Sequence, residues 1–321
     1  MTGATGKVGN AVARQLVDRG DEVVALVRNA AKARDLLPSG VELASGDVTN
    51  PESLRRAAEG TDGAFNCMGL FEQWFADPGI FERVNARGAA NVIDAARECG
   101  VRRVVHTSTF DVFHAESGGT VSEGAVADYS KGTPYERSKQ HAEELVLAEA
   151  DKGIDVVIVN PASVYGPGPW QGTGLDRAFR DAIRRRLPGV PPGGMTLVHC
   201  DDVAAGQLAA FDRGRPGERY ILADGYATMR ELLTVVVDEA GRGWVPPAMP
   251  VPLARGLAMT GEALSRVIRR PPLLGSGQLT FLLWQARADS AKATSELGVE
   301  FRPWEEGVRQ TVRWMAETGR I

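Results

Sequence analysis

Short apolar runs rich in β-branched residues alternate with segments of helical periodicity along the first half of the chain. The runs predict strands over Glu22–Val27, Val41–Leu43, Gly63–Cys67, Arg103–Thr107 and Asp155–Asn160. The periodic segments predict helices over Ala30–Leu37, Pro51–Glu59, Val84–Cys99 and Pro134–Asp151. Such alternation is typical of a parallel sheet wrapped by helices. We therefore predict a Rossmann-type, doubly wound α/β domain over residues 1–160, including the helix that begins at Pro134.

The pattern becomes irregular after Pro161. Proline and glycine gather at 166–169 and 188–194, between shorter elements. These elements are strands near Thr196–Val198 and Arg219–Leu222 and helices over Asp202–Phe211 and Met229–Ala240. Doubly wound folds bind ligands at the carboxyl edge of the sheet. We interpret residues 161–321 as mostly a smaller substrate-binding lobe at that edge, with some segments returning to the Rossmann core.

A glycine-rich loop opens the chain. Gly3, Gly6 and Gly9 have the spacing G-x-x-G-x-x-G and lead into a helical pattern. Glycine permits positive φ and close backbone approach, and a helix N-terminus attracts a pyrophosphate. Lys7 is followed by Val8, whereas a Walker A loop has Ser or Thr there. The loop predicts a dinucleotide site and excludes a Walker A site.

The strand that should precede this loop is short. A dinucleotide loop follows a strand, yet Met1 stands at the last position of that strand. Two explanations are open: the natural chain starts upstream, which we favour, or the fold lacks its first strand. Either way, we expect the central strand to be truncated in this chain.

Tyr135 and Lys139 stand four residues apart in a predicted helix. Side chains at i and i+4 share a helix face. An ammonium beside a phenol favours the phenolate and lowers its pKa, so this tyrosine could exchange a proton near neutral pH. We predict that the pair is catalytic.

Composition narrows the class of protein. The chain has 321 residues, 43% of them hydrophobic, and a net charge of −4, which gives no global attraction to nucleic acid. No apolar run approaches the roughly 18–20 residues of a membrane span. Three dispersed cysteines lack metal-ligand spacing and predict reduced thiols in a cytoplasmic protein. We predict no metal site.

The motifs together resemble the extended short-chain dehydrogenase/reductase family over nearly the whole chain, and most closely its NAD-dependent epimerase/dehydratase and dihydroflavonol-4-reductase-like branch. The segments that carry the resemblance are TGATGKVG, GDV at Gly46–Val48, VN at Val84–Asn85, VVHTST at Val104–Thr109, PYERSK at Pro134–Lys139, NPASVYGPG at Asn160–Gly168 and VHCDDVA at Val198–Ala204. The resemblance is specific for the family and poorly specific for the substrate.

The resemblance implies a role for each matching residue. Tyr135 matches the catalytic proton donor or acceptor, and Lys139 the lysine that lowers its pKa and binds the nicotinamide ribose. Thr109 matches the catalytic hydroxyl that orients the substrate oxygen, with Ser108 as the alternative. The matching cofactor residues are Gly3, Thr5, Gly6, Lys7 and Val8 at the pyrophosphate, Asp47 and Val48 at the adenine, Cys67, Met68 and Gly69 beneath the cofactor, and Pro161 and Val164 at the nicotinamide.

The end of the second predicted strand bears on cofactor choice. NAD enzymes place Asp or Glu there to bind the ribose hydroxyls, whereas this chain has Val27 followed by Arg28. A guanidinium can bind a 2′-phosphate bidentately. We therefore include Arg28 in the cofactor site and favour NADP(H) over NAD(H).

Three functions are consistent with these residues. The first is an NADP(H)-dependent oxidoreductase acting on a carbonyl or secondary alcohol of a small, apolar substrate, as the apolar segments Phe71–Phe75, Trp170 and Pro247–Met259 suggest. The second is an NAD-dependent sugar or nucleotide-sugar epimerase or dehydratase. The third, which we favour least, is a non-catalytic NAD(P)-sensing regulator. Both a monomer and a homodimer remain open.

Overall fold

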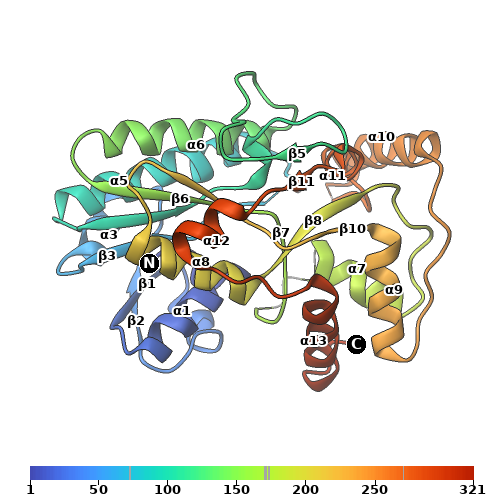
Figure 1. The fold of residues 1–321 in the computed structure, drawn as a ribbon, viewed down its shortest axis with the longest axis horizontal. Helices are drawn as coiled ribbons and strands as arrows, with labels where there is room; N and C mark the ends of the chain where they lie inside the picture. Colours follow the sequence, from blue (N-terminus) through green and yellow to red (C-terminus); the bar gives the residue numbers. More distant parts are fainter. Residues whose placement is uncertain (72–73, 170–171, 173, 270) are drawn as a thin grey trace.

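A parallel sheet covered by helices occupies one end of the molecule (Figure 1). The computed structural model describes residues 1–71, 74–169, 172, 174–269 and 271–321. The sheet strands are β1 (Val23–Val27), β2 (Val41–Ser45), β3 (Gly63–Asn66), β4 (Arg103–Thr107), β6 (Asp155–Pro161) and β9 (Arg219–Leu222). They pair in parallel as β2-β1 and as β3-β4-β6-β9. This arrangement confirms the predicted fold class.

Met1 and Thr2 lie between the two groups of strands. The amide of Leu26 in β1 donates to the Met1 carbonyl at 2.9 Å, and the Thr2 amide donates to the Phe65 carbonyl in β3 at 2.9 Å. Thr2 also forms a parallel bridge with Asn66. The expected central strand is thus represented by two residues, which connect both groups into one sheet.

Helices cover both faces of this sheet (Figure 1). One face carries α1 (Lys7–Arg19), α8 (Cys200–Arg213) and α12 (Ala291–Leu297), and the other carries α3 (Pro51–Ala58), α5 (Gly88–Glu98) and α6 (Pro134–Ala150). The four consecutive residues 156–159 of β6 are fully buried. A continuous apolar run is what a strand needs when both of its faces are covered, so the hydrophobic pattern of β6 follows from this layering.

Two helices differ from their predicted bounds by three residues or more at one end, whereas α3, α6 and α8 differ by one or two. The segment predicted as Ala30–Leu37 forms only α2 (Ala30–Arg34), since Leu36 and Leu37 turn back to the Ala33 carbonyl and Pro38 disfavours a helical residue before it. The helix predicted over Val84–Cys99 begins earlier, with α4 (Gly79–Phe81) and the π-helical turn η1 (Glu82–Arg87) ahead of α5. Single π turns inside helices often mark functional positions.

The second lobe contains a smaller sheet and several helices at the other end of the molecule (Figure 1). Its sheet has the order β10-β8-β7, with β7 (Ser163–Tyr165), β8 (Gly194–His199) and β10 (Tyr226–Thr228). Its helices are α7 (Gly174–Ile183), α9 (Met229–Ala240), α10 (Val251–Ile268), α11 (Ser276–Trp284) and α13 (Trp304–Glu317). A short turn η2 (Phe110–Val112) and the parallel pair β5 (Thr120–Val121) and β11 (Arg287–Ala288) connect the lobes. The division at residue 160 stays a prediction.

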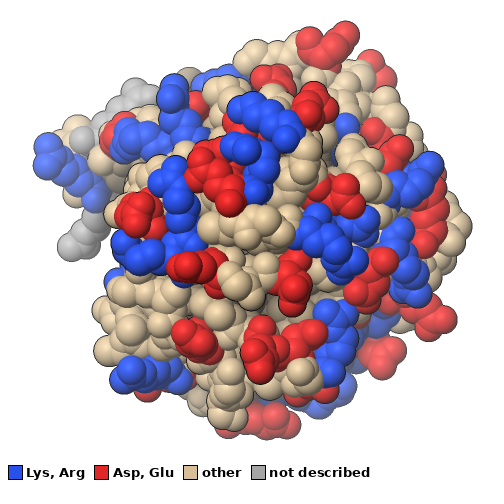
Figure 2. All heavy atoms as spheres, turned by 90° about the vertical axis from the view of Figure 1, so that its left-hand side faces the viewer, with Lys and Arg blue, Asp and Glu red and all other residues tan. Residues whose placement is uncertain are grey.

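The surface and the thiols agree with the composition. Figure 2 shows basic and acidic side chains intermixed over one face of the described chain. None of the helices that the structure describes has the length and hydrophobicity of a membrane span. Cys67, Cys99 and Cys200 are free thiols.

Candidate active site

The glycine loop folds tightly against the end of β3. Gly3 has φ +70°, and a Cβ at this position would lie 2.5 Å from the Cys67 carbonyl oxygen. A Cβ on Gly9 would lie 2.2 Å from the Gly3 carbonyl oxygen. Gly6 precedes α1 without a side-chain cap, so the first-turn N–H groups are left for a ligand. A cradle that only glycine permits, at an uncapped helix start, fits a dinucleotide pyrophosphate.

Lys7 connects this loop to the second lobe. Its Nζ donates to the Gly166 carbonyl at 2.5 Å and lies 3.1 Å from the Asp176 carboxylate. Its side chain is therefore committed to protein partners, and its backbone N–H is the group left for the predicted phosphate contact. The neighbouring Thr5 and Val8 are half-buried in the same loop.

Arg28 and Asp47 lie at the ends of adjacent strands. Arg28 is exposed directly after β1, and Val48 is buried after Asp47. The Asp47 carboxylate accepts hydrogen bonds from the Thr49 N–H at 2.9 Å and the Thr49 hydroxyl at 2.7 Å. Partial burial opposes ionisation, but these bonds and the positive charge of Arg28 lower the pKa of Asp47 overall. The predicted adenine end thus brings an ionised carboxylate close to a guanidinium.

The segment after β3 lies beneath the glycine loop. The Cys67 thiol donates to Gln207 Oε1 at 3.2 Å, and burial raises its pKa to about 11. Met68 is half-buried and packs against the core that includes Val48, whereas Gly69 is exposed. Cys67 is therefore a packed, protonated thiol and not a nucleophile.

The helix α6 begins with a complete capping box. The Thr133 hydroxyl accepts from the Glu136 amide, and the Glu136 carboxylate accepts from the Thr133 amide, with Pro134 at the first helical position. This arrangement satisfies two N-terminal amides and fixes where the helix starts. It thereby fixes the positions of Tyr135 and Lys139, one turn apart.

Lys139, the predicted catalytic cation, is almost completely buried. Its side chain is 3% exposed, and its Nζ donates to the Thr107 carbonyl at the end of β4, at 2.8 Å. Burial lowers its pKa to about 8, although the charges of Glu143 and Asp111 oppose the change. Tyr135 is half-buried, and its ring packs edge-on against Phe81 at 6.0 Å between centroids. The ammonium is thus held within the carboxyl edge of the sheet.

Both candidate hydroxyls follow β4. The Thr109 hydroxyl accepts from the Asp111 amide at 3.3 Å and so caps η2. Ser108 is held through its amide, which donates to the Val159 carbonyl at 2.8 Å. Its hydroxyl is buried and has no hydrogen-bond partner in the described part of the chain. The structure therefore brings Thr109, Ser108 and Lys139 to the same end of β4.

Asn85 joins this region, although the sequence suggested only that it belongs to a family motif. Its Oδ1 accepts from the Leu70 amide at 2.7 Å, and its Nδ2 donates to the Leu70 carbonyl at 2.9 Å and the Ser138 hydroxyl at 3.1 Å. It lies in the π-helical turn η1. Asn85 thus fixes the segment beneath the predicted cofactor against α6, a role that only the contact reveals.

A buried ionic network behind Lys139 was also missed. Glu143 is 2% exposed; its Oε2 accepts from Arg219 Nε at 2.6 Å and its Oε1 from Asn160 Nδ2 at 2.8 Å. Asn160 also donates to the Thr109 carbonyl at 3.1 Å. The network joins α6, β6, β9 and the segment of Thr109. Its signal in the sequence was a charged residue one turn after Lys139 on the same helix face.

The remaining predicted positions lie where β6 leaves the sheet. Pro161 is buried at the end of β6, and Val164 is half-buried in β7. Where β8 passes into α8, His199, Cys200 and Asp201 bring their ligand-type atoms within 4.8 Å of one another. The Asp201 amide donates to His199 Nδ1, and the Cys200 thiol donates to the Pro167 carbonyl, so both groups have protein partners.

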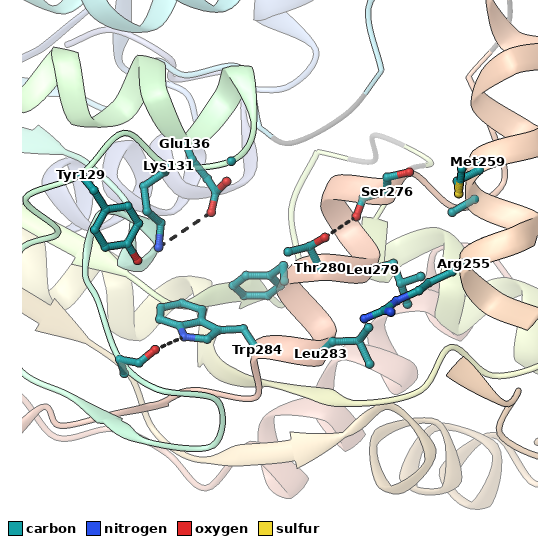
Figure 3. A pocket seen from close by; sticks show the side chains of 14 residues that line it. Tyr129, Lys131, Glu136, Arg255, Met259, Ser276, Leu279, Thr280, Leu283 and Trp284 are labelled. Carbon is teal, nitrogen blue, oxygen red and sulfur yellow. Dashed lines mark hydrogen bonds and ion pairs between the residues drawn. The ribbon is translucent and has the colours of Figure 1, made fainter. Parts of the chain in front are cut away.

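A cavity of about 590 Å³ adjoins the start of α6 (Figure 3). Its walls come from the segment Tyr129–Gly132, from Glu136, and from α10 and α11. Tyr135, Lys139 and Thr109 do not line it. Its wall is connected to two of them through neighbouring residues: Glu136 follows Tyr135 in α6, and the ring of Trp284 packs 5.3 Å, between centroids, from Phe110, which follows Thr109. Trp170 and residues 72–73, part of the predicted apolar set, lie outside the described residues.

Comparison with known proteins identifies the family. The model of the NAD dependent epimerase/dehydratase family matches residues 1–223. The chain therefore belongs to this family, and its fold and glycine loop are those of the extended short-chain dehydrogenases/reductases. It is accordingly an NAD(P)-dependent enzyme of the oxidoreductase type.

Individual relatives extend over the whole chain. It is 32% identical over 324 residues to sterol demethylase protein B of Methylococcus capsulatus, covering 100% of this chain and 99% of that protein. It is 28% identical over 332 residues to a Synechocystis protein named provisionally as a dihydroflavonol 4-reductase, covering 100% and 95%. Among solved structures, that of gox2253 has a TM-score of 0.82 and 30% identity, covering 100% of this chain and 98% of that one. These matches confirm the predicted family and branch.

Proposed function

We propose that this protein is an NADP(H)-dependent oxidoreductase that interconverts a carbonyl and a secondary alcohol on an apolar substrate. The observation that carries the proposal is Lys139: a buried ammonium with a lowered pKa, bound to the end of β4 and one helical turn from Tyr135. A cation in this position stabilises the phenolate of the neighbouring tyrosine. The same strand end brings Thr109 and Ser108 into the site.

In this proposal the bound nicotinamide supplies or accepts the hydride. Tyr135 gives a proton to the substrate oxygen in reduction and takes it back in oxidation, and Thr109 orients that oxygen, with Ser108 as the alternative. Lys139 holds the phenolate and the ribose. The backbone of Gly3–Val8 binds the pyrophosphate, and Asp47 and Val48 contact the adenine. Cys67–Gly69 lie beneath the cofactor, and Pro161 and Val164 contact the nicotinamide.

The preference for NADP(H) rests on Arg28. It is exposed immediately after β1, and Asp47 is the carboxylate whose pKa its charge lowers. A 2′-phosphate would add a second anionic partner for this guanidinium. An apolar substrate is supported by the names of the two relatives, one a sterol demethylase protein and the other a flavonoid-type reductase.

The test is a thermal-shift titration with NADP(H) and NAD(H) separately, followed by turnover assays on apolar ketones. A cofactor at about 100 times its Kd adds about 2.7 kcal/mol to stability. We expect the larger shift with NADP(H), its loss in Arg28→Glu, and loss of turnover with retained cofactor binding in Tyr135→Phe. A larger shift with NAD(H) would overturn the cofactor preference, and full turnover by Tyr135→Phe would overturn the proposed chemistry.

A second candidate is an NAD-dependent sugar epimerase or dehydratase. It is favoured by the family model, whose description names these activities and which matches residues 1–223. Cofactor that copurifies and resists dialysis would support it, because such enzymes recycle the nicotinamide within one turnover. A homodimer, a cytoplasmic location and the absence of nucleic-acid partners stay predictions.

A further inference from the structure

Arg255, which is exposed, is the one cation in the described lining of the cavity beside α6 that has no partner among the described residues. Arg255 of α10 lines the cavity and makes no hydrogen bond or ion pair with any described residue. Figure 3 shows its side chain extending from α10 toward Leu279 and Leu283. A guanidinium has five N–H donors and no acceptor, so this group can take an anion.

The other charges that line the cavity already have partners. Lys131 Nζ donates to the Phe113 carbonyl at 2.9 Å and lies 4.6 Å from the centre of the Trp284 ring. Glu136 accepts from the Thr133 amide at 2.8 Å and lies 3.9 Å from Lys131 Nζ. These two opposite charges offset each other within the wall. Arg255 therefore determines the sign of the charge that a ligand would meet.

The rest of the lining is mainly apolar. Its apolar members are Ala115, Ala258, Met259, Leu279, Phe281, Leu283 and Trp284. The Trp284 indole donates to the Ala115 carbonyl at 2.8 Å, so its polar atom is satisfied and the ring presents hydrocarbon. About 590 Å³ lies within the range of roughly 300–1,000 Å³ typical of small-molecule sites.

We propose that this cavity binds the substrate as an amphipathic anion, with its apolar body against Trp284, Phe281 and Leu279 and a carboxylate on Arg255. This inference rests on the proposed function, because the cavity wall includes Glu136, the residue after Tyr135, and Trp284, which packs against Phe110, the residue after Thr109. A carboxylate matches the planar fork of arginine and forms paired, charge-assisted hydrogen bonds. The substrate class is therefore an apolar oxo or hydroxy acid.

The test uses dodecanoate and its neutral counterpart dodecanol as probes, titrated calorimetrically into the NADP⁺-loaded protein. Arg255→Gln is expected to weaken dodecanoate binding at least about tenfold, as the loss of a charge-assisted hydrogen bond implies, and to change dodecanol binding less than twofold. Arg255→Lys should fall between Arg255→Gln and the unmodified protein. Arg230→Gln, which removes an exposed arginine of α9 outside the cavity, should leave both probes unchanged.

A second variant tests whether the probes bind inside this cavity. Thr280 is exposed and lines the cavity, so Thr280→Trp should fill it and weaken both probes at least about tenfold. Equal losses in Arg255→Gln and Arg230→Gln, equal losses of dodecanoate and dodecanol in Arg255→Gln, or unchanged binding in Thr280→Trp would overturn the proposal.

The outcomes separate this inference from the proposed function, because probe binding needs no turnover. Arg255-dependent dodecanoate binding in a protein that reduces no ketone would support the anion site and count against the reductase. Turnover of neutral ketones at full rate in Arg255→Gln, without Arg255-dependent binding of dodecanoate, would support the reductase and overturn the anion site.

Discussion

Replacing Lys139 by methionine is expected to make the protein more stable and almost inactive. The buried Lys139 ammonium has a pKa of about 8, below its ordinary value of 10.5. One pKa unit corresponds to 1.36 kcal/mol, so the folded state loses roughly 3 kcal/mol at pH 7 by holding this charge. Methionine has a similar length and no charge. The change also leaves the Thr107 carbonyl without its 2.8 Å donor, which costs about 1–2 kcal/mol. The net expectation is about 1–2 kcal/mol of added stability.

The sign of the pH dependence tests this reasoning. Because the folded pKa is the lower one, the unfolded chain binds more protons between about pH 8 and 10.5, and the penalty disappears as the pH rises through that window. Urea unfolding should therefore show Lys139→Met more stable than the unmodified protein at pH 7 and no more stable at pH 10. Ketone turnover should fall at least about 100-fold.

Lys152→Met is the matched control. Lys152 follows the same helix, and its side chain is 56% exposed, so its removal should change stability by less than about 0.5 kcal/mol at either pH. If Lys139→Met lowers stability at pH 7 by the same amount as at pH 10, the inferred cost of burying the ammonium is refuted.

Three further predictions follow from the backbone and the buried polar contacts. Gly3→Ala should lower stability by more than about 2 kcal/mol and abolish the NADP(H) thermal shift. Its control, Gly20→Ala, has a similar positive φ and nothing within 4 Å of the added Cβ, so it should lower stability by about 1 kcal/mol and keep the shift. Equal effects of the two variants would contradict the close-contact argument. Glu143→Gln should lower the free energy of unfolding, measured in urea, by about 2 kcal/mol. This loss is smaller than the roughly 3–5 kcal/mol for breaking a fully buried ion pair, because Arg219 reaches solvent. A loss under about 0.5 kcal/mol would contradict the inferred role of the Glu143–Arg219 pair. Asn85→Ala should lower kcat/KM about tenfold, because it releases the segment at Leu70 from α6; unchanged kinetics would show that Asn85 has no positioning role.

Local rules were sufficient wherever neighbours in the chain decide the conformation. The helix predicted to begin at Pro134 does begin there, and the structure has a complete capping box at its start. Gly3 was expected to need positive φ and close approach, and it has both. The Ala30–Leu37 helix was too long because helical periodicity was given more weight than the effect of Pro38.

Contacts between distant segments could not be predicted in this way. Glu143, Asn160 and Arg219 are ordinary polar residues in the sequence and form one buried network only after α6 packs on β6 and β9. The cavity depends in the same way on α10 and α11 meeting the segment before α6. The sequence indicated only an apolar stretch over Pro247–Met259, and Arg255 within it could not be recognised as part of a cavity wall without the residues opposite it.

The sequence by itself determined the class of this protein: a glycine loop, a Tyr-x-x-x-Lys helix and alternating strands and helices, all of which depend on spacing and on conformational preferences within a few residues. The tertiary structure alone decided that Met1 and Thr2 join two groups of strands, that the Lys139 ammonium is buried against Thr107, and that Arg255 faces an apolar cavity. These features depend on desolvation and on pairing across the fold. Both are properties of the three-dimensional surroundings of a side chain, which spacing along the chain does not specify.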